Sequence, residues 1–367
     1  MSENIISTVA KNSLVIVVGN RPQFIKLAPV VEELNKRELS YTVVHTGQHY
    51  DHQMSGVFFK ELGIRKPDIQ IQLNSRLHGA MTAEILEKLE SIFLEITPKG
   101  ILLFGDTNST LAAGLAAVKM KIPIAHVEAG PRLGSFDTPE ESNRLIVDHL
   151  SVLRFCCDLY SIENLKREGI TSGVVNSGDV MYDAFLKYSV QSRVTKNGNR
   201  KSIYLTLHRP QNVDSLEAHL EILDFIRQCG CDVFFPLHAR TKAKIEELDL
   251  MDKYKSIESL TLSEPLGYVE SIGQINAADV VMTDSGGVQK EAYFAGKLAI
   301  LMLPEGPWPD LISSGWLLLG GWVSQQQMLA TFKRISGSAL PDLRPDFFGV
   351  GRAAEIIVDE LVKKRLL

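Results

Sequence analysis

Short apolar runs alternate with amphipathic segments along the whole chain. The runs have the length of buried strands and lie at residues 14–18, 41–45, 101–104, 124–127, 203–206, 233–237, 279–283 and 298–303. Segments with a helical period separate them, at residues 24–36, 81–95, 110–119, 140–149, 217–229 and 288–295. This alternation of strands and helices predicts an α/β protein with parallel, doubly wound sheets.

A polar stretch at residues 188–201 has neither a helical nor a strand period. Such a stretch between two sets of strands and helices indicates a linker. A chain of 367 residues has the length of two ordinary domains. We therefore expect one α/β domain over residues 1–188 and a second over residues 189–350.

Charged and polar residues follow directly after most of the predicted strands. Asp106 follows the run at 101–104, Glu128 follows 124–127, and His208 comes two residues after 203–206. Ligands bind beyond the carboxyl ends of parallel strands, so these side chains predict a site there. Together with Glu140 they offer carboxylates and an imidazole for general acid–base chemistry. Glu140 has a second interpretation, as an acidic residue that favours a helix N-terminus.

A phosphate ligand is indicated where the apolar run at 279–283 breaks into Ser285-Gly286-Gly287 before a helix. A helix N-terminus presents backbone N–H groups and a positive dipole, which together bind phosphate. The two glycines leave the backbone open to a diphosphate. The alternative interpretation is an ordinary strand-to-helix turn with a serine N-cap.

Composition narrows the class of protein further. Hydrophobic residues make up 45% of the chain and charged residues 23%, and the net charge is −5 without any Lys/Arg block, so we expect no nucleic-acid partner. No apolar run reaches membrane-spanning length and residues 1–11 are too polar for a secretory signal, so we expect no membrane partner and a cytoplasmic protein.

The cysteines are Cys156, Cys157, Cys229 and Cys231. They lack zinc-ligand spacing and indicate buried thiols rather than metal ligands. Dinucleotide and Walker-type glycine motifs are missing, so no cofactor is expected.

Seven short motifs carry a family resemblance that spans nearly the whole chain. They are Arg21-Pro22-Gln23-Phe24-Ile25-Lys26, Thr46-Gly47-Gln48-His49, Gly105-Asp106-Thr107, His126-Val127-Glu128-Ala129-Gly130, Pro139-Glu140-Glu141-Ser142-Asn143-Arg144, His208-Arg209 and Thr283-Asp284-Ser285-Gly286-Gly287. In order and spacing the chain resembles the non-hydrolysing UDP-N-acetylglucosamine 2-epimerases. The resemblance implies a GT-B fold, with two Rossmann-like domains and the active site between them. It also implies a homodimer, and a C-terminal helix at about residues 351–367 that packs back on the N-terminal domain.

The same resemblance implies a reaction and a set of site residues. UDP is eliminated from a UDP-linked N-acetyl sugar and added back after carbon 2 has been reprotonated on the other face. Asp106, Glu128 and Glu140 would handle the proton, and His208 would assist departure of the diphosphate. The residues assigned to the UDP-sugar are Arg21, Lys26, Arg144, His238, Ser285, Gly286, Gly287, Glu291 and Asp310.

The resemblance is incomplete in the loop at residues 303–310. Leu303 and Pro307 stand where the family usually has Arg and Glu, and Asp310 stands in for a second Glu. We expect Asp310 to bind the ribose hydroxyls, the alternative being a solvated loop acid. A uronic acid or deoxy sugar is open as the substrate beside N-acetylglucosamine. Other activities remain as alternatives: a GT-B glycosyltransferase, a hydrolysing epimerase, or a sensor without catalysis.

Overall fold

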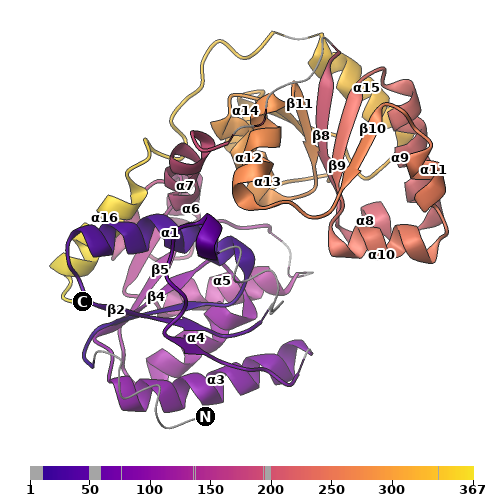
Figure 1. Cartoon of the computed structure of the whole chain (residues 1–367). Helices are drawn as coiled ribbons and strands as arrows, with labels where there is room; N and C mark the ends of the chain where they lie inside the picture. Colours follow the sequence, from indigo (N-terminus) through magenta and orange to yellow (C-terminus); the bar gives the residue numbers. More distant parts are fainter. Residues whose placement is uncertain are drawn as a thin grey trace. The chain divides into compact units, whose positions relative to one another are not determined.

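The computed structural model describes residues 11–48, 59–75, 77–134, 136, 138–192, 194, 200–337 and 339–367. The chain divides into two compact units (Figure 1). Unit 1 takes in Met1–Ala184 and Asp346–Leu367, and unit 2 takes in Phe185–Pro345. His49, the last residue of the Thr46-Gly47-Gln48-His49 motif, lies outside the described residues, as do residues 1–10.

Unit 1 contains, over its described residues, a seven-stranded parallel sheet in the order β3-β2-β1-β4-β5-β6-β7. The strands are β1 (Leu14–Val18), β2 (Tyr41–His45), β3 (Ile69–Gln70), β4 (Gly100–Phe104), β5 (Ile124–Val127), β6 (Leu153–Cys156) and β7 (Val174–Asn176). Its helices are α1 (Arg21–Lys36), α3 (His78–Ile96), α4 (Asn108–Lys119), α5 (Pro139–Leu150), α6 (Leu159–Arg167) and α16 (Ala353–Lys363), and α7 (Val180–Ser189) runs across the boundary between the units. The strand order reverses between β1 and β4, which is where ligands bind in such sheets.

Unit 2 repeats this architecture with a six-stranded parallel sheet over its described residues, in the order β10-β9-β8-β11-β12-β13. The strands are β8 (Ser202–Thr206), β9 (Asp232–Pro236), β10 (Leu260–Ser263), β11 (Val280–Thr283), β12 (Leu298–Leu301) and β13 (Leu317–Leu319). The helices are α8 (Pro210–Val213), α9 (Leu216–Gln228), α10 (Ala239–Glu247), α11 (Met251–Lys255), α12 (Tyr268–Ala277), α13 (Gly286–Phe294), α14 (Pro309–Ser313) and α15 (Gln325–Ser336). Here the strand order reverses between β8 and β11.

The core of each unit forms because the central strands are buried on both faces. All residues of β1, β4 and β5 are buried, as expected for a parallel sheet covered by helices on both sides. Helix α3 buries Ile85, Leu89 and Ile92, which pack in one cluster with alanines of α4. Small residues on α4 let that helix lie close to its neighbours, where Gly114 has Val147 of α5 beside it.

The C-terminal helix α16 belongs to unit 1. It packs on α1, and Arg37 near the end of α1 pairs with Asp359 at 2.5 Å. At its start, the backbone N–H groups of Ala353 and Ala354 donate to the carboxylate of Asp183, which caps the helix. The chain end is fixed as well, since Leu366 packs against Gly100 of β4.

The predicted strands and helices recur in the structure with shifted ends, and the α/β class with parallel sheets is confirmed. Helices α1, α3 and α4 begin two or three residues before the predicted starts at 24, 81 and 110. Their first turns contain residues such as Arg21, His78 and Asn108, which do not show the apolar period. Five strands were missed, namely β3, β6, β7, β10 and β13, of which β3, β7 and β13 have only two or three residues. The predicted linker at 188–201 overlaps the last residues of α7, and much of it lies outside the described residues.

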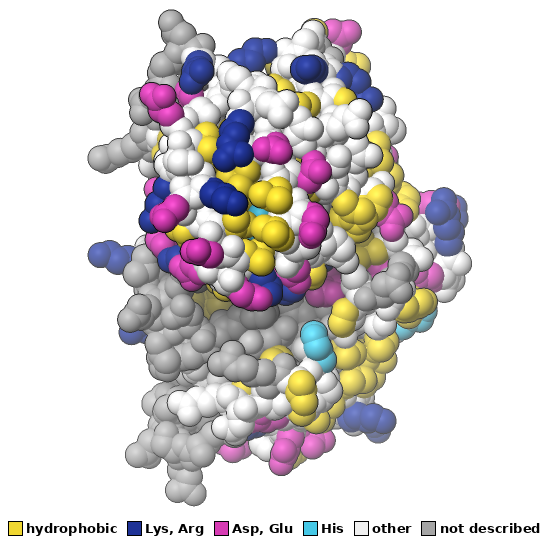
Figure 2. Space-filling model, turned by 90° about the vertical axis from the view of Figure 1, so that its right-hand side faces the viewer, with side chains coloured by type: hydrophobic (Ala, Val, Ile, Leu, Met, Phe, Trp, Pro, Cys, Tyr) yellow, Lys and Arg dark blue, Asp and Glu magenta, His cyan; other side chains and the backbone are white. Residues whose placement is uncertain are grey.

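The surface and the thiols agree with the composition. On the face that Figure 2 shows, described Lys/Arg and Asp/Glu side chains are interspersed over the surface. In the described part of the chain, no helix is long and apolar enough to cross a bilayer. Cys156, Cys157 and Cys231 are buried free thiols, as predicted, but Cys229 is only half-buried. No group of potential metal ligands occurs among the described residues.

Candidate active site

Two carboxylates lie at the carboxyl ends of neighbouring strands in unit 1. Asp106 follows β4 and Glu128 follows β5, and the register of these strands pairs Phe104 with Val127. Parallel strands end at the same edge of a sheet, so both side chains belong to that edge. Glu128 is only 8% exposed and adopts a φ of 65°, a left-handed conformation that non-glycine residues rarely take. Such strain persists only where the surrounding structure enforces it, which is common at functional sites.

Each of these carboxylates faces a cation from a helix. Lys26 of α1 pairs with Glu128, and Arg144 of α5 pairs with Asp106. Arg144 also donates to the backbone oxygen of Glu128 at 2.6 Å, so one guanidinium holds both strand ends. Burial by itself would lower the pKa of Arg144, but nearby carboxylates, first Asp106 and then Glu128, raise it. In unit 1 the two carboxylates are thus each held in a charge pair.

Glu140 is placed differently from the other two carboxylates. It lies in the first turn of α5, is exposed, and shows none of the contacts that join Asp106 and Glu128 to their cations. Its neighbour Glu141 is buried and accepts from the backbone N–H groups of Leu133 and Gly134, at 2.9 and 3.2 Å. Glu140 and Arg144 are four residues apart on α5 and therefore share a helix face. Both interpretations of Glu140, as a catalytic group and as a helix-terminal charge, are compatible with this position.

Gln23 of α1 is a structural member of the site that was not among the candidates from sequence. Its amide nitrogen donates to the Phe104 oxygen at 2.6 Å and to the hydroxyls of Thr107 and Thr110 at 3.1 and 3.0 Å. Its amide oxygen accepts from the Gly19 N–H at 2.6 Å. Gln23 thereby ties the loop after β1 to the loop after β4, and fixes the backbone around Asp106. Gln23 belongs to the Arg21-Pro22-Gln23 motif, and this membership is the feature of the sequence that could have indicated its role.

In unit 2, a histidine and an aspartate meet where the strand order reverses. The Nδ1 atom of His208, two residues after β8, lies 3.0 Å from Oδ1 of Asp284, which follows β11 directly. The Asp284 carboxylate also accepts from the backbone N–H of Arg209 at 2.9 Å and from the side chain of Asn212 at 3.0 Å. Burial alone would raise the pKa of Asp284, but these bonds, with that of His208 first, lower it. An ionised Asp284 accepts a hydrogen bond from Nδ1–H, which leaves Nε2 of His208 as the atom available for chemistry.

The predicted phosphate-binding segment lies beside this pair. Gly286 and Gly287 form the first turn of α13, and Ser285 is its N-cap residue without a side-chain capping bond. A Cβ atom added to Gly286 would meet nothing within 4 Å, so space is open in front of this backbone. The ring of His238, at the N-cap of α10, lies 5.2 Å from the ring of His208. Glu291 is 5% exposed on the second turn of α13.

Comparison with known proteins decides the family. The family model described as UDP-N-acetylglucosamine 2-epimerase matches residues 32–362. This chain belongs to the UDP-N-acetylglucosamine 2-epimerase family. The resemblance predicted from the motifs is therefore confirmed.

Individual members of this epimerase family match over almost the full chain. A UDP-2,3-diacetamido-2,3-dideoxy-D-glucuronate 2-epimerase of Pseudomonas aeruginosa is 39% identical, over 95% of this chain and 99% of its own length. A UDP-N-acetylglucosamine 2-epimerase homologue of Methanococcus maripaludis is also 39% identical, over 95% of this chain and 99% of its own. A crystal structure of the Methanocaldococcus jannaschii UDP-GlcNAc 2-epimerase, in complex with UDP-GlcNAc and UDP, superimposes with a TM-score of 0.86 at 33% identity. That superposition covers 96% of this chain and 99% of the other, which confirms the GT-B class of two Rossmann-like units.

The loop that departs from the usual family pattern is attached to helix α13, at whose start phosphate binding is predicted. Trp308 is 5% exposed, and its Nε1 donates to the Gly286 oxygen at 3.1 Å. The ammonium of Lys290 on α13 lies 4.3 Å from the centre of the Trp308 ring, a cation–π contact. Lys290 is 1% exposed, and neither it nor Trp308 was a candidate from sequence. Asp310 is half-buried in the first turn of α14, and its proposed ribose contact stays a prediction.

Proposed function

We propose that the protein inverts carbon 2 of a UDP-linked 2-acetamido sugar without hydrolysing it. The observation that carries the proposal is the pair of carboxylates Asp106 and Glu128, each matched with a cation at the edge of the unit 1 sheet in a member of this epimerase family. The pair suits removal of a proton from one face of a carbon and its return to the other. A homodimer and a cytoplasmic location stay predictions.

In the proposed reaction one carboxylate removes the proton from carbon 2. The bond between carbon 1 and the diphosphate oxygen breaks, and UDP leaves with the electron pair. A 2-acetamidoglycal remains. The other carboxylate returns a proton to the opposite face of carbon 2, and UDP adds back to carbon 1. Asp106 and Glu128 are the groups we assign to these transfers, with Glu140 as the third candidate.

The diphosphate is assigned to donors that stabilise its negative charge as it departs. Ser285, Gly286 and Gly287 offer backbone N–H groups at the start of α13, and Arg21 offers a guanidinium at the start of α1. His208, oriented by Asp284, would donate its proton from Nε2 to the leaving oxygen. The remaining assignments to the UDP-sugar are Lys26, Arg144, His238, Glu291 and Asp310, of which Lys26 and Arg144 would also orient the two carboxylates.

The proposed reaction predicts exchange of one substrate hydrogen with solvent. Incubation of the protein with UDP-N-acetylglucosamine or UDP-2,3-diacetamido-2,3-dideoxy-glucuronate in deuterated water should replace hydrogen at carbon 2 by deuterium, without added NAD. Proton NMR would follow loss of the signal and the appearance of the second epimer. Free sugar and UDP as the main products would favour the hydrolysing alternative. Transfer to an acceptor without exchange would contradict the proposal.

The phosphate-binding segment gives a separate prediction. Gly286→Val should weaken UDP binding by at least about tenfold, because the side chain would fill the open space in front of the α13 N–H groups. The same space allows unit 2 to fold around the new side chain. Calorimetric titration with UDP measures the effect, and Gly337→Val, past the end of α15, is the matched control. Equal UDP affinity of wild type and Gly286→Val would remove this segment from the site.

A further inference from the structure

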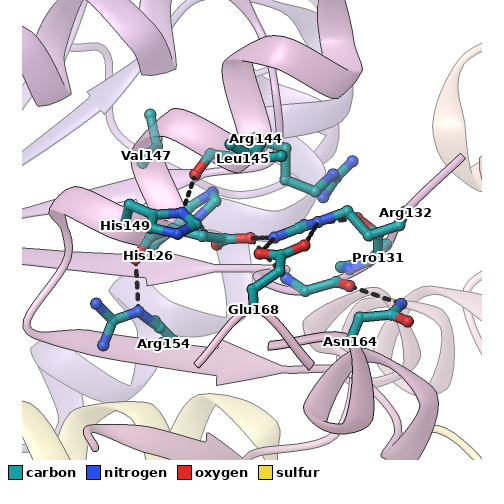
Figure 3. Close-up of polar contacts among 12 residues, drawn as sticks. His126, Pro131, Arg132, Arg144, Leu145, Val147, His149, Arg154, Asn164 and Glu168 are labelled. Atoms are coloured by element: carbon teal, nitrogen blue, oxygen red, sulfur yellow. Dashed lines mark hydrogen bonds and ion pairs between the residues drawn. The ribbon is translucent and has the colours of Figure 1, made fainter. Parts of the chain in front are cut away.

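A buried histidine and aspartate lie behind the two carboxylates of unit 1. His126 of β5 and Asp148 of α5 are both 0% exposed, and His126 Nδ1 lies 2.7 Å from Asp148 Oδ1. On its other side, His126 Nε2 lies 2.7 Å from the backbone oxygen of Gly105. Figure 3 shows His126 among the arginines and Glu168 that surround this pair. Neither residue can touch a substrate, since both side chains are enclosed.

The partners of His126 determine its charge. A backbone carbonyl only accepts, so Nε2 must carry a hydrogen towards Gly105. An ionised carboxylate also only accepts, so Nδ1 carries a hydrogen towards Asp148. Burial alone would raise the pKa of Asp148, but the contacts with His126 and Arg132 lower it, which favours the ionised form. Only a ring with a hydrogen on both nitrogens, an imidazolium, satisfies these two acceptors together.

Further charged groups surround the pair. Arg132 contacts the second oxygen of Asp148 at 2.8 Å and is itself paired with Glu168 at 2.7 Å. Arg154 of β6 donates to the backbone oxygen of Asp148 at 2.5 Å, next to the ionised side chain. The thiol of Cys156 on β6 contributes no charge, because burial raises its pKa. A protonated His126 and Asp148 thus form an ion pair inside a cluster that also holds two arginines and one further carboxylate.

His126 and Asp148 each contact the backbone close to one of the two proposed catalytic carboxylates. Gly105, which His126 holds, precedes Asp106 and has a φ of 62°. Gly130, whose N–H donates to Asp148 at 3.1 Å, comes two residues after Glu128 and has a φ of 94°. A side chain at position 130 would lie 2.4 Å from the Ser161 oxygen, so this turn cannot shift freely. One ion pair thereby connects the loop of Asp106 to the loop of Glu128.

We propose that His126 and Asp148 are positioning residues that fix the separation of Asp106 and Glu128. The imidazolium holds the Gly105 carbonyl, just before Asp106, and the carboxylate holds the Gly130 amide, two residues after Glu128, so proton removal and return occur at a set geometry. This inference rests on the proposed function of those two carboxylates. Small displacements of catalytic groups cost large factors in rate, which is why such a support matters.

A second buried histidine provides a comparison within the same chain. His219 of unit 2 is also 0% exposed, with Nδ1 at 2.8 Å from the Tyr254 hydroxyl and Nε2 at 2.9 Å from the Val213 oxygen. A hydroxyl can donate, so a neutral ring satisfies both contacts. Burial also lowers the pKa of His219. We therefore expect one ring proton on His219 and two on His126.

Nitrogen NMR of protein labelled with ¹⁵N-histidine tests the charge directly and needs no activity. Spectra of His126→Gln and His219→Gln assign the two rings by difference. At neutral pH both ring nitrogens of His126 should carry hydrogen, whereas His219 should show one protonated and one bare nitrogen. A bare nitrogen on His126 would overturn the ion pair.

Kinetics tests the positioning role. In the His126→Gln variant, the side-chain amide can still donate to the Gly105 oxygen but does not reach Asp148. In the His126→Asn variant, the shorter side chain places its amide near Asp148 and away from Gly105. Both variants should lower kcat and the rate of carbon 2 exchange by about tenfold to a hundredfold. KM and the affinity for UDP should change by less than about threefold, because the nucleotide groups are untouched. His219→Gln should retain wild-type kcat per folded molecule.

The outcomes separate this inference from the proposed function. If the wild type exchanges carbon 2 hydrogen and both His126 variants exchange it at the same rate, the positioning role is wrong. A lower melting temperature with unchanged kcat would mean that the pair only stabilises the fold, which also overturns it. If the wild-type protein exchanges carbon 2 hydrogen of no UDP-sugar, the proposed function is contradicted instead. The NMR result still decides the charge of His126 in that case.

Discussion

Glu128→Gln should lower kcat by about a hundredfold to ten-thousandfold, the range for loss of an acid–base group. Glutamine has nearly the shape of glutamate but accepts no proton at neutral pH. The change also leaves the ammonium of Lys26 without its carboxylate, so Lys26 should reorient. Asp106→Asn, which breaks the pair with Arg144, should behave similarly. Turnover and carbon 2 exchange, measured on the same preparation, provide the test.

A paired carboxylate outside the site is the matched control for these variants. Glu33 on α1 pairs with Arg37 at 2.6 Å, and Glu33→Gln should keep wild-type kcat. Both classes of variant should bind UDP with normal affinity, because the assigned nucleotide contacts lie in other residues. Near wild-type turnover of Glu128→Gln would exclude Glu128 from proton transfer. A loss of folded protein, seen by circular dichroism, would call for Glu128→Asp as the milder replacement.

The second large effect concerns His208. His208→Asn should reduce kcat by at least about a hundredfold, because His208 is the imidazole that Asp284 holds with Nε2 ready to assist the leaving diphosphate. Asp284→Asn should also reduce kcat, since the bond that orients Nδ1 becomes weaker. Asp284 additionally accepts from Arg209 and Asn212, so this variant should unfold at a lower temperature than His208→Asn.

A double-variant cycle tests whether His208 and Asp284 act together. If Asp284 works through His208, the double variant should be about as slow as His208→Asn alone. Additive losses would mean that Asp284 acts independently, for example through the backbone of the loop after β8. His219→Asn, at a buried histidine away from the strand ends, is the control for loss of an imidazole. Unchanged kcat in His208→Asn would exclude His208 from the leaving-group step.

The local pattern of the sequence was enough for the architecture. Short apolar runs such as residues 14–18 and 101–104 have the length of buried strands, and their alternation with amphipathic segments predicted parallel sheets. Strands as short as Ile69–Gln70 carry no such signal, because their pairing with β2 rather than their composition makes them strands. Helix starts were missed for a related reason. The first turn is defined by capping and backbone geometry, as at Asn20, whose side chain accepts from the Gln23 N–H.

The sequence by itself also identified which residues follow the strands, and so placed Asp106, Glu128, His208 and Gly286 at the sheet edges. Only the tertiary structure decided their partners. Lys26 and Glu128 are 102 positions apart in the chain, and His208 and Asp284 are 76 apart. No periodicity reports on such pairs, because they form when strands from distant segments take neighbouring places in a sheet. The same holds for His126, because only the folded chain brings the Asp148 carboxylate and the Gly105 oxygen to its ring.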